Sequence, residues 1–326
     1  MGSCTVQDTI YGTFTLGEPV LIDLLQSPAI QRLKKISQYG IPHEFYGLPG
    51  FTRYDHSVGV MLLLHKLGAS VKEQIAGLLH DASHTAFSHL VDWVIGDRVT
   101  EDFQDKNHSF MLERYNVPTI LEKYGFDFQQ ITRLESFSLL EQPAPDLCAD
   151  RVDYALREFQ LWAAPSIVHL CVNSLVCHHN KIAFSSADAA ETFARAYLKC
   201  QTQHWGYAEY VLRYELFSQI LKYALQHNII ALEDFYEDDS YVMNKLHTSS
   251  DTFILDELNY LHSRFRYRLT DQNPEYTLKK KFRNVDPSYI MSGKLYRLSE
   301  THHDFRSFLQ TQRTINEQGI KATIIR

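Results

Sequence analysis

The sequence predicts a mainly α-helical body with small β-hairpin additions at its N- and C-terminal ends. Hydrophobic residues make up 44% of the 326 residues and charged residues 22%, so the chain can bury a sizeable core. Apolar residues recur at helical spacing as far as position 228, with Ser, Pro and Gly at the expected boundaries. Segments rich in Thr, Tyr and Phe lie near both ends and are broken by glycines, which is typical of hairpins.

The N-terminal part begins with a hairpin and a helix. Residues 5–22 favour strands because Thr, Tyr, Phe and Ile dominate them and two glycines punctuate them. Residues 27–40 predict a helix: Ser27 is a candidate N-cap, Pro28 fits the first helical position, and Gly40 is placed to end it. Further helices are expected at 55–67, 71–81, 88–95, 107–124, 146–162 and 187–228.

The C-terminal part mixes strand and helix signals. Residues 279–300 predict a hairpin that turns at Ser292 and Gly293. Residues 321–326, with the sequence KATIIR, predict a closing strand. No internal repeat or low-complexity tract is visible, so the chain is not predicted to be a solenoid or a repeat array.

The charge is unevenly distributed along the chain. Residues 263–326 carry 13 Lys/Arg against 6 Asp/Glu, a net charge of +7, whereas the other 262 residues carry 19 against 33, a net charge of −14. The basic end either docks on the acidic body or offers an anion- or nucleic-acid-binding surface. Because its charges alternate with strand-like residues instead of clustering, the sequence favours docking.

Composition also bears on cellular location and metal chemistry. The five cysteines are scattered and form no CxxC motif, which favours a reduced cytoplasmic protein over a disulfide framework or a thiolate zinc site. The longest apolar stretch, around 58–64, is far shorter than the roughly 20 residues of a membrane span. The N-terminal residues show no secretory signal pattern. Any metal ion is therefore expected to be held by His and carboxylate groups.

Histidine usage is the strongest functional signal. Six of the 16 histidines fall in one short stretch of the chain, at positions 56, 65, 80, 84, 89 and 108. His80 and Asp81 are adjacent at the end of an apolar helix, where the chain leaves the core. A His from one helix, this His-Asp pair and a later Asp form a mixed nitrogen and oxygen set. Such a set suits a divalent ion such as Mg²⁺, Mn²⁺, Fe²⁺, Co²⁺ or Zn²⁺.

The segment DLCADRVDY (146–154) supplies the later Asp. Asp150, Asp153, Tyr154 and Arg157 share one helical face, and Asp153 and Arg157 are spaced as an ion pair, which leaves Asp150 for the metal. Each residue alone is ambiguous, because a single His at the end of an apolar helix is more often a core residue. The ordered combination is what carries the signal.

The ordered set His56, His80-Asp81 and Asp150 resembles the HD superfamily of metal-dependent phosphohydrolases. The surrounding sequence is similar to the deoxynucleoside triphosphate triphosphohydrolases with a sterile-alpha-motif/HD architecture and to their bacterial relatives. The matching segments, in order, are DTIYGTF (8–14), SPAIQRLKKISQYG (27–40), FTRYDHSVGV (51–60), IAGLLHDASHTAFSHLVD (75–92) and DRVDYALRE (150–158). The C-terminal hairpin FRNVDP…GKLYRLSE is similar to the bacterial relatives. The resemblance is dense over about 8–158 and thin over 160–260.

The resemblance implies a domain division. Residues 1–162 would form the HD-domain catalytic core with its N-terminal hairpin, and residues 163–262 a helical extension that completes the core. Residues 263–326 would form a small basic α+β subdomain. No sterile-alpha-motif domain is expected, because no such segment precedes the core in this sequence.

The resemblance also implies residue roles. One divalent metal ion (Mn, Fe, Mg, Co, Ni or Zn) would be held by His56, His80, Asp81 and Asp150. The catalytic residues would be the Asp92 and His108 pair, which transfers a proton to the leaving oxygen, together with His84. The substrate-binding residues would be Gln38, Tyr39, Arg53, His89, Arg151 and Tyr154. His84 and His89 would line the phosphate channel, Arg53 would clamp a phosphate, and His204 would lie in the outer wall.

Two departures from the resembled branch affect the substrate more than the reaction. Arg151 stands where those enzymes usually have Lys, and Tyr39 stands where the regulated enzyme has Leu beside the sugar. A Tyr there would narrow or reshape the sugar pocket. Regulation by a guanine nucleotide is not expected, because Lys34 and Gln26 also depart from the regulated pattern.

The main functional hypothesis is a metal-dependent phosphohydrolase acting on a nucleotide, including a deoxynucleoside triphosphate, or on a related phosphate ester. The alternative is an HD-fold module that binds a nucleotide or nucleic acid and regulates without turnover. The filled ligand positions favour the enzyme. The expected partners are the small-molecule substrate and further copies of the chain in a dimer or tetramer. No membrane partner is expected, and nucleic acid stays open.

Overall fold

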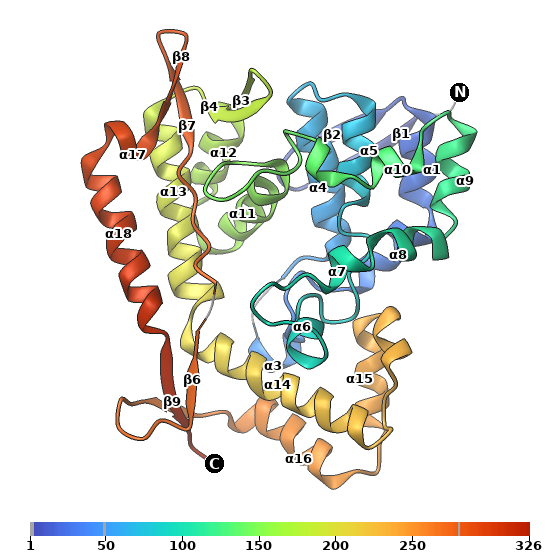
Figure 1. Ribbon diagram of the computed structural model, residues 1–326, viewed down its shortest axis with the longest axis vertical. Coiled ribbons are helices and arrows are strands. Elements are labelled where there is room, and N and C mark those ends of the chain that lie inside the picture. Colours follow the sequence, from blue (N-terminus) through green and yellow to red (C-terminus); the bar gives the residue numbers. More distant parts are fainter. Residues whose placement is uncertain (1–2, 48–49, 280) are drawn as a thin grey trace.

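The computed structural model describes residues 3–47, 50–279 and 281–326, and it confirms the mainly α-helical fold with small β-sheets (Figure 1). The N-terminal hairpin pairs β1 (Cys4–Asp8) with β2 (Gly12–Leu16) in antiparallel register. The hairpin predicted over 5–22 is confirmed over residues 4–16, but it ends earlier than predicted because α1 (Pro19–Gln26) begins with Pro at its first position.

The predicted helix over 27–40 is also too long. It consists of α2 (Pro28–Gln31) and a 3-10 turn (Arg32–Lys35), and the chain becomes extended at Ile36. Backbone bonds to the next segment explain this ending: Gln38 N donates to Phe51 O at 2.9 Å, and Arg53 N donates to Ile36 O at 2.9 Å. This pairing fixes the loop that leads into the helix beginning at Arg53. The short helix α3 (His43–Tyr46) lies within it.

Two long helices position the metal-binding motif. The first, α4 (Arg53–Lys66), starts with a capping box between Thr52 and Asp55, and the second, α5 (Val71–Leu79), is capped by Ser70. Close packing between helices depends on glycine at one position. A Cβ at Gly59 would lie 1.9 Å from Arg157 Nη2, so only glycine lets the later helix α11 (Ala149–Trp162) approach α4 this closely.

A series of short helices follows the turn at His80 and Asp81, which we call the HD turn. They are α6 (Leu90–Val94), α7 (Phe103–Lys106), α8 (His108–Arg114), α9 (Val117–Lys123), α10 (Phe128–Ile131) and a 3-10 turn (Leu134–Ser136). The single helix predicted over 107–124 is therefore two helices. Asn116 adopts a left-handed conformation (φ 57°) between them, and Pro118 begins the second.

The helix predicted over 187–228 is also interrupted. It forms α13 (Ala187–Cys200), a π-helical turn (Gln201–Trp205) and α14 (Ala208–Gln226). A Cβ at Gly206 would lie 2.6 Å from Gln201 O, so glycine permits the chain to change direction there. The neighbouring elements are α12 (Pro165–Ser174), β3 (Leu175–His178), β4 (Lys181–Phe184), α15 (Asp239–His247), α16 (Thr252–Asn259), a 3-10 turn (Leu232–Tyr236) and a π turn (Tyr260–Arg264).

The C-terminal part contributes to two sheets. In one, β5 (Tyr267–Leu269) and β6 (Tyr276–Leu278) flank β9 (Ile320–Ile324). In the other, β7 (Ser288–Met291) and β8 (Lys294–Arg297) extend the β3–β4 hairpin, which the sequence did not predict. The turn at Ser292 and Gly293 is confirmed, because both have positive φ. The helices α17 (Leu298–Thr301) and α18 (His303–Gln318) follow.

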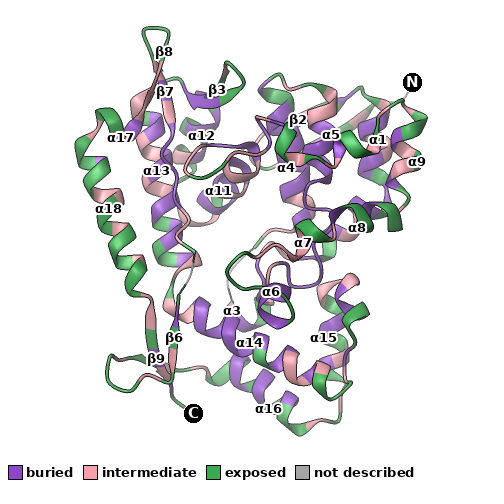
Figure 2. Cartoon of the chain, in the orientation of Figure 1, coloured by how far each residue is buried: buried purple, intermediate pink, exposed green. Residues whose placement is uncertain are grey.

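The core has two parts that flank the site. The larger cluster joins α1, α4, α5, α11 and α13, and the smaller one joins α6, α14, α15 and α16. Figure 2 shows buried residues concentrated along α4, α13 and α14, whereas α18 is largely exposed. In the described ranges, no helix combines the length and apolar character needed to cross a bilayer.

Candidate metal centre and active site

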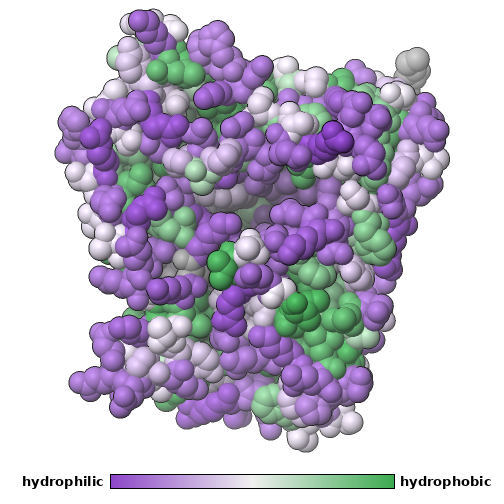
Figure 3. All heavy atoms as spheres, viewed as in Figure 1, coloured by the Kyte–Doolittle hydropathy of each residue, from purple (hydrophilic) through white to green (hydrophobic). Residues whose placement is uncertain are grey.

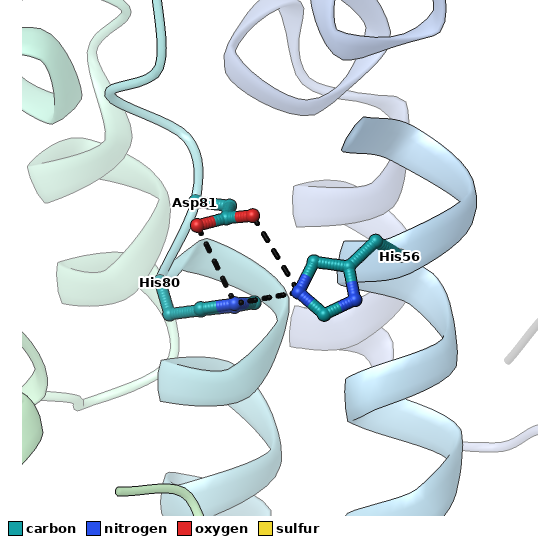
Figure 4. Close-up of side chains that lie close together, drawn as sticks. All are labelled: His56, His80 and Asp81. Carbon is teal, nitrogen blue, oxygen red and sulfur yellow. Dashed lines mark hydrogen bonds and ion pairs between the residues drawn. The ribbon is translucent and has the colours of Figure 1, made fainter. Parts of the chain in front are cut away.

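The candidate metal centre lies between α4 and the end of α5. His56 projects from α4, and His80 and Asp81 project from the turn that ends α5, so that the three side chains point toward one another (Figure 4). All three are almost completely buried. His56 Nε2 lies 3.2 Å from His80 Nε2 and 3.5 Å from Asp81 Oδ2. The helices therefore bring together residues that are separated by 24 positions.

Asp150 joins this group from the first turn of α11. Its Oδ1 lies 3.0 Å from His56 Nε2 and 3.7 Å from His80 Nε2. Two ligand atoms bound about 2.1 Å from one divalent ion at angles of about 90–110° lie roughly 3.0–3.4 Å apart. The observed separations are close to this range. The two imidazoles and two carboxylates thus fit a hard or borderline divalent cation.

Neighbouring groups orient the imidazoles. His56 Nδ1 lies 2.8 Å from Asp153 Oδ2, and Asp153 is fixed in turn by Arg157, whose Nε donates to it at 2.8 Å. Arg157 also donates to Asp8 of β1 at 2.7 Å, which links the N-terminal hairpin to the site. His80 Nδ1 donates to the carbonyl of Gly77 at 2.7 Å. Both imidazoles therefore direct Nε2 toward the candidate ion.

Electrostatics also favour a cation at this point. Burial lowers the pKa of His80, but the carboxylates of Asp81 and Asp150 outweigh burial and raise the pKa to about 10. Burial raises the pKa of Asp150, but hydrogen bonds with His56 and His80 bring that pKa below its usual range. The carboxylates of Asp81 and Asp150 therefore stabilise positive charge at this buried position. A bound divalent ion would supply that charge.

A second group of potential ligands adjoins the first. Glu141, Cys148 and Asp150 have ligand atoms within 4.8 Å of one another. Burial raises the pKa of the Cys148 thiol to about 12, and Arg151 Nη1 donates to its sulfur at 3.3 Å. A protonated thiol is a poor ligand. The His56, His80, Asp81 and Asp150 set is therefore the better metal site.

A pocket of about 770 Å³ opens beside the metal centre. Its wall includes His80, Asp81 and Asp150, and it contains both aromatic rings and cations. The face drawn in Figure 3 is hollowed near its middle, where hydrophilic side chains form most of the rim. The tyrosines in the wall are Tyr39, Tyr154, Tyr197, Tyr210 and Tyr214, and the basic residues are Arg53, His80, His89, Arg151, Lys281 and Arg283.

Arg53 begins α4 and is oriented by two contacts. Its Nη1 donates to Asp81 Oδ2 at 2.5 Å, and its Nε donates to Ser88 Oγ at 2.9 Å. Ser88 and its neighbour Phe87 both have left-handed backbone conformations (φ 52° and 62°), which bend the chain sharply after the HD turn. Within the ranges that the structure describes, Nη2 of Arg53 makes no hydrogen bond. The guanidinium therefore has a donor left for a ligand in the pocket.

The expected pairing of Asp92 with His108 is wrong. Asp92 Oδ2 lies 3.6 Å from His89 Nδ1, and Asp92 Oδ1 accepts from Phe103 N at 2.9 Å. His108 Nδ1 lies 3.3 Å from Ser83 Oγ instead. Burial, reinforced by His80, lowers the pKa of His108 to about 4. The Asp81 carboxylate raises this pKa, but burial and His80 outweigh it. The His next to Asp92 that lines the pocket is His89.

His84 lies behind the metal centre. Its Nε2 is 3.2 Å from Asp81 Oδ1, and its ring packs edge-on against His89 with centroids 4.7 Å apart. Burial, with Arg53 second, lowers the pKa of His84 well below its usual range. A buried neutral ring in this place positions Asp81 and His89. A direct catalytic role for His84 stays a prediction.

The other predicted substrate residues lie in the pocket wall. Arg151 directs its donors at main-chain carbonyls, including Asp146 O at 2.5 Å, so its contact with phosphate stays a prediction. The Tyr154 hydroxyl is hydrogen-bonded to that of Tyr197. Tyr39 donates from its hydroxyl to Glu158 Oε2 at 3.0 Å, and Gln38 borders the same end of the pocket.

Glu158 organises the aromatic end of the pocket, although no sequence pattern identified it as a site residue. The carboxylate, 2% exposed, lies 3.1 Å from His204 Nδ1 and accepts hydrogen bonds from Tyr39, Trp162 and Trp205. His204 is buried, contacts Glu158 and the Tyr39 ring, and is not itself a lining residue of the pocket, so its place in the outer wall stays a prediction. Asp153 was seen in the sequence only as an ion-pair partner of Arg157. Its contact with His56 depends on the distance between α4 and α11, which no local pattern reveals.

Comparisons with known proteins agree with this geometry. A family model described as HD domain matches residues 53–157. A Bacillus subtilis protein named uncharacterized protein YdhJ is 34% identical over 324 residues, which cover 98% of this chain and 99% of that protein. The metal-dependent phosphohydrolase cns2 of Cordyceps militaris is 35% identical over 228 residues, which cover 67% of this chain and 66% of that protein.

Shorter or more distant matches extend the picture. The human deoxynucleoside triphosphate triphosphohydrolase SAMHD1 is 36% identical over 104 residues, which cover 27% of this chain and 16% of that enzyme. A crystal structure of a phosphohydrolase from Bacteroides thetaiotaomicron has a TM-score of 0.71 at 17% identity, and the match covers 92% of this chain and 94% of that one. The full-length relative, the matched domain and the shared fold show that this chain belongs to the HD-domain superfamily of metal-dependent phosphohydrolases.

Proposed function

We propose that this protein hydrolyses a phosphate ester of a nucleotide, with one divalent metal ion held by His56, His80, Asp81 and Asp150. The observation that carries the proposal is the pocket itself. Three of the four converging groups, His80, Asp81 and Asp150, line one wall in contact with the buried His56, and the other walls hold tyrosines and basic side chains. Aromatic rings suit a sugar and a base, and cations suit phosphate. The similarity to human SAMHD1 supports a deoxynucleoside triphosphate as a candidate substrate.

The chemistry divides between the ion and the chain. A bound divalent ion polarises a phosphoryl oxygen and lowers the pKa of bound water, which supplies a nucleophile near neutral pH. Arg53 donates from Nη2 to a phosphoryl oxygen while Nη1 keeps Asp81 in place. As the water oxygen attacks phosphorus, the bond from phosphorus to the ester oxygen breaks. The departing oxygen takes a proton from His89, and Asp92 orients and stabilises the His89 ring.

The proposal is tested by measuring metal content and turnover on the same purified protein. We expect stoichiometric divalent metal and metal-dependent release of phosphate, pyrophosphate or triphosphate from members of a panel of nucleoside mono-, di- and triphosphates. Binding of a nucleotide without any turnover, in protein with full metal content, would instead support the regulatory module that binds without hydrolysis.

Arg53→Ala should lower kcat/KM without removing the metal, because a guanidinium clamps phosphate but does not ligate a cation. Charge-assisted hydrogen bonds contribute about 1.5–3 kcal/mol, so we expect a roughly 10- to 100-fold loss. Arg53→Lys should rescue only part of the activity, because Lys lacks the planar fork that also contacts Ser88.

A matched control is Arg98→Ala. Arg98 is half-exposed, pairs with Glu215 and lies outside the pocket wall. It should keep normal kcat/KM. If Arg53→Ala kept normal kcat/KM as well, the phosphate would be bound elsewhere in the pocket.

A further inference from the structure

A segment from the basic C-terminal part of the chain forms one wall of the active-site pocket. Residues 281–284 line the same cavity as Asp81 and Asp150, although they are more than 130 positions from either in the sequence. Figure 1 shows the extended connection between β6 and β7 running beside α13, toward the middle of the molecule. The HD motif alone therefore does not complete the pocket.

Several contacts hold this segment in place. Val285 is fully buried, and Asp286 N donates to Pro145 O at 3.0 Å in the loop before α11. Gln201 Nε2 donates to Lys281 O at 3.4 Å, and the guanidinium of Arg313 lies over the Phe282 ring at 5.2 Å from its centroid. Because the chain is fixed on both sides, the side chain between these anchors, Arg283, enters the pocket from a defined place.

Arg283 faces the pocket with most of its donors available. Its Nη2 donates to Glu101 Oε2 at 3.1 Å, and this is its one hydrogen bond to the residues that the structure describes. A guanidinium has five N–H donors, so one carboxylate contact leaves the majority unused. The Arg283 side chain is 33% exposed, whereas Glu101 is 12% exposed. A ligand in the pocket can therefore reach Arg283.

Arg283 is connected to the metal centre through a tyrosine wall. Tyr154, Tyr197 and Tyr214 line the same pocket as Arg283. The Tyr154 ring lies 6.3 Å from the His56 ring, measured between centroids. A substrate whose reacting phosphoryl group lies at the metal ligands would thus extend past Tyr154 toward Arg283.

The basic side chains in the wall differ in how many of their donors are already hydrogen-bonded within the protein. Arg53 is bonded to Asp81 beside the metal ligands, and Arg151 is bonded to backbone carbonyls. Among the described residues, Arg283 is hydrogen-bonded to a single carboxylate, that of Glu101 in the loop before α7, and Lys281 lies two residues away in the same wall. A phosphate carries more negative charge than a carboxylate and accepts from a guanidinium in the same bidentate manner, so it would compete effectively with Glu101.

We propose that Arg283 binds a second phosphate of the substrate, remote from the reacting one, and that Glu101 occupies this position until the substrate displaces it. The inference rests on the proposed function and specifies it: the preferred substrate carries two or more phosphates. A structural role is the competing explanation, in which the Arg283–Glu101 pair only fastens the C-terminal segment to the loop before α7.

The test compares wild type, Arg283→Ala, Arg283→Lys and Glu101→Gln, each checked for metal content and melting temperature. Isothermal titration with inorganic triphosphate and with orthophosphate measures binding without requiring turnover. We expect Arg283→Ala to weaken triphosphate binding about 10- to 100-fold more than orthophosphate binding, because charge-assisted bonds to the remote phosphate are lost. Arg283→Lys should recover part of the difference. Glu101→Gln should tighten triphosphate binding, because a competing carboxylate is removed.

Kinetics then separate the two proposals. With nucleoside mono- and triphosphates as substrates, Arg283→Ala should raise the KM ratio of triphosphate to monophosphate at least tenfold. Equal losses for both ligands in titration, or weaker triphosphate binding by Glu101→Gln, would show that the pair is structural and overturn the inference. If wild type bound triphosphate through Arg283 but hydrolysed no nucleotide, the proposed function would fail while the anion site stood.

Discussion

His80→Ala and Asp81→Asn should each remove the bound metal and reduce phosphate release to the background rate. Each substitution deletes one of the four groups whose atoms converge at 3.0–3.7 Å. Loss of a residue that merely orients a ligand typically costs 10- to 100-fold in metal affinity, so loss of a ligand should cost more. Metal content by atomic emission and activity on the same samples should fall together.

The choice of Asn at position 81 separates metal loss from unfolding. Asp81 is also the buried partner of Arg53, with side-chain exposures of 6% and 4%. Deleting one member of a buried pair typically costs about 3–5 kcal/mol, so Asp81→Ala could lose activity by losing stability. The amide of Asn still accepts from Arg53, and a melting curve measures any remaining cost.

His65→Ala is the matched histidine control. His65 lies on the same helix as His56, is exposed, and contacts Gln74 and the Phe14 ring instead of the pocket. It should retain both metal and activity. Full metal occupancy in a His80→Ala/Asp81→Asn double variant would show that the ion binds elsewhere.

The convergence of the four candidate ligands could be predicted because their order along the chain matches the resembled superfamily. His56 lies on a predicted helix, the His80-Asp81 pair ends an apolar helix, and Asp150 lies on a third predicted helix. Their order and spacing make the combination specific even though each alone is not.

The surrounding shell could not be predicted because it depends on contacts between distant segments. Asp153 reaches His56 only because Gly59 allows α11 to approach α4. Arg283 enters the pocket from a segment in which the resemblance identified a hairpin but no site residue. The predicted end of the helix over 27–40 was wrong for the same reason. The chain leaves helical geometry at Ile36 because residues 51–53 provide other hydrogen-bond partners for its backbone.

His89→Ala should slow turnover about 10²- to 10⁴-fold while the protein keeps its metal, which is the usual cost of losing a general acid. His89 lines the pocket, and its Nδ1 lies 3.6 Å from Asp92 Oδ2, close enough for a small rotation to make a hydrogen bond. The Asp92 carboxylate lies where it can orient the ring for proton transfer to the departing oxygen.

The dependence on the leaving group identifies that role. A nitrophenolate leaves without needing a proton, so the loss in His89→Ala should shrink markedly when p-nitrophenyl phosphate or a nitrophenyl ester of the nucleotide replaces the natural ester. Asp92→Asn should show the same dependence with a smaller loss, because the ring remains but loses its orienting charge. If His89 only positioned the substrate, His89→Ala would lose the same factor in turnover on both kinds of ester.

His108→Gln provides the internal comparison. Burial and His80 lower the pKa of His108 to about 4, so its ring is neutral near pH 7. A neutral imidazole is not the acidic form that would protonate the leaving oxygen. Glutamine keeps a polar group beside Ser83, so His108→Gln should lose less than His89→Ala and should lose it equally for good and poor leaving groups. If the loss depended on the leaving group in the His108 variant but not in the His89 variant, His108 would be the proton donor instead of His89.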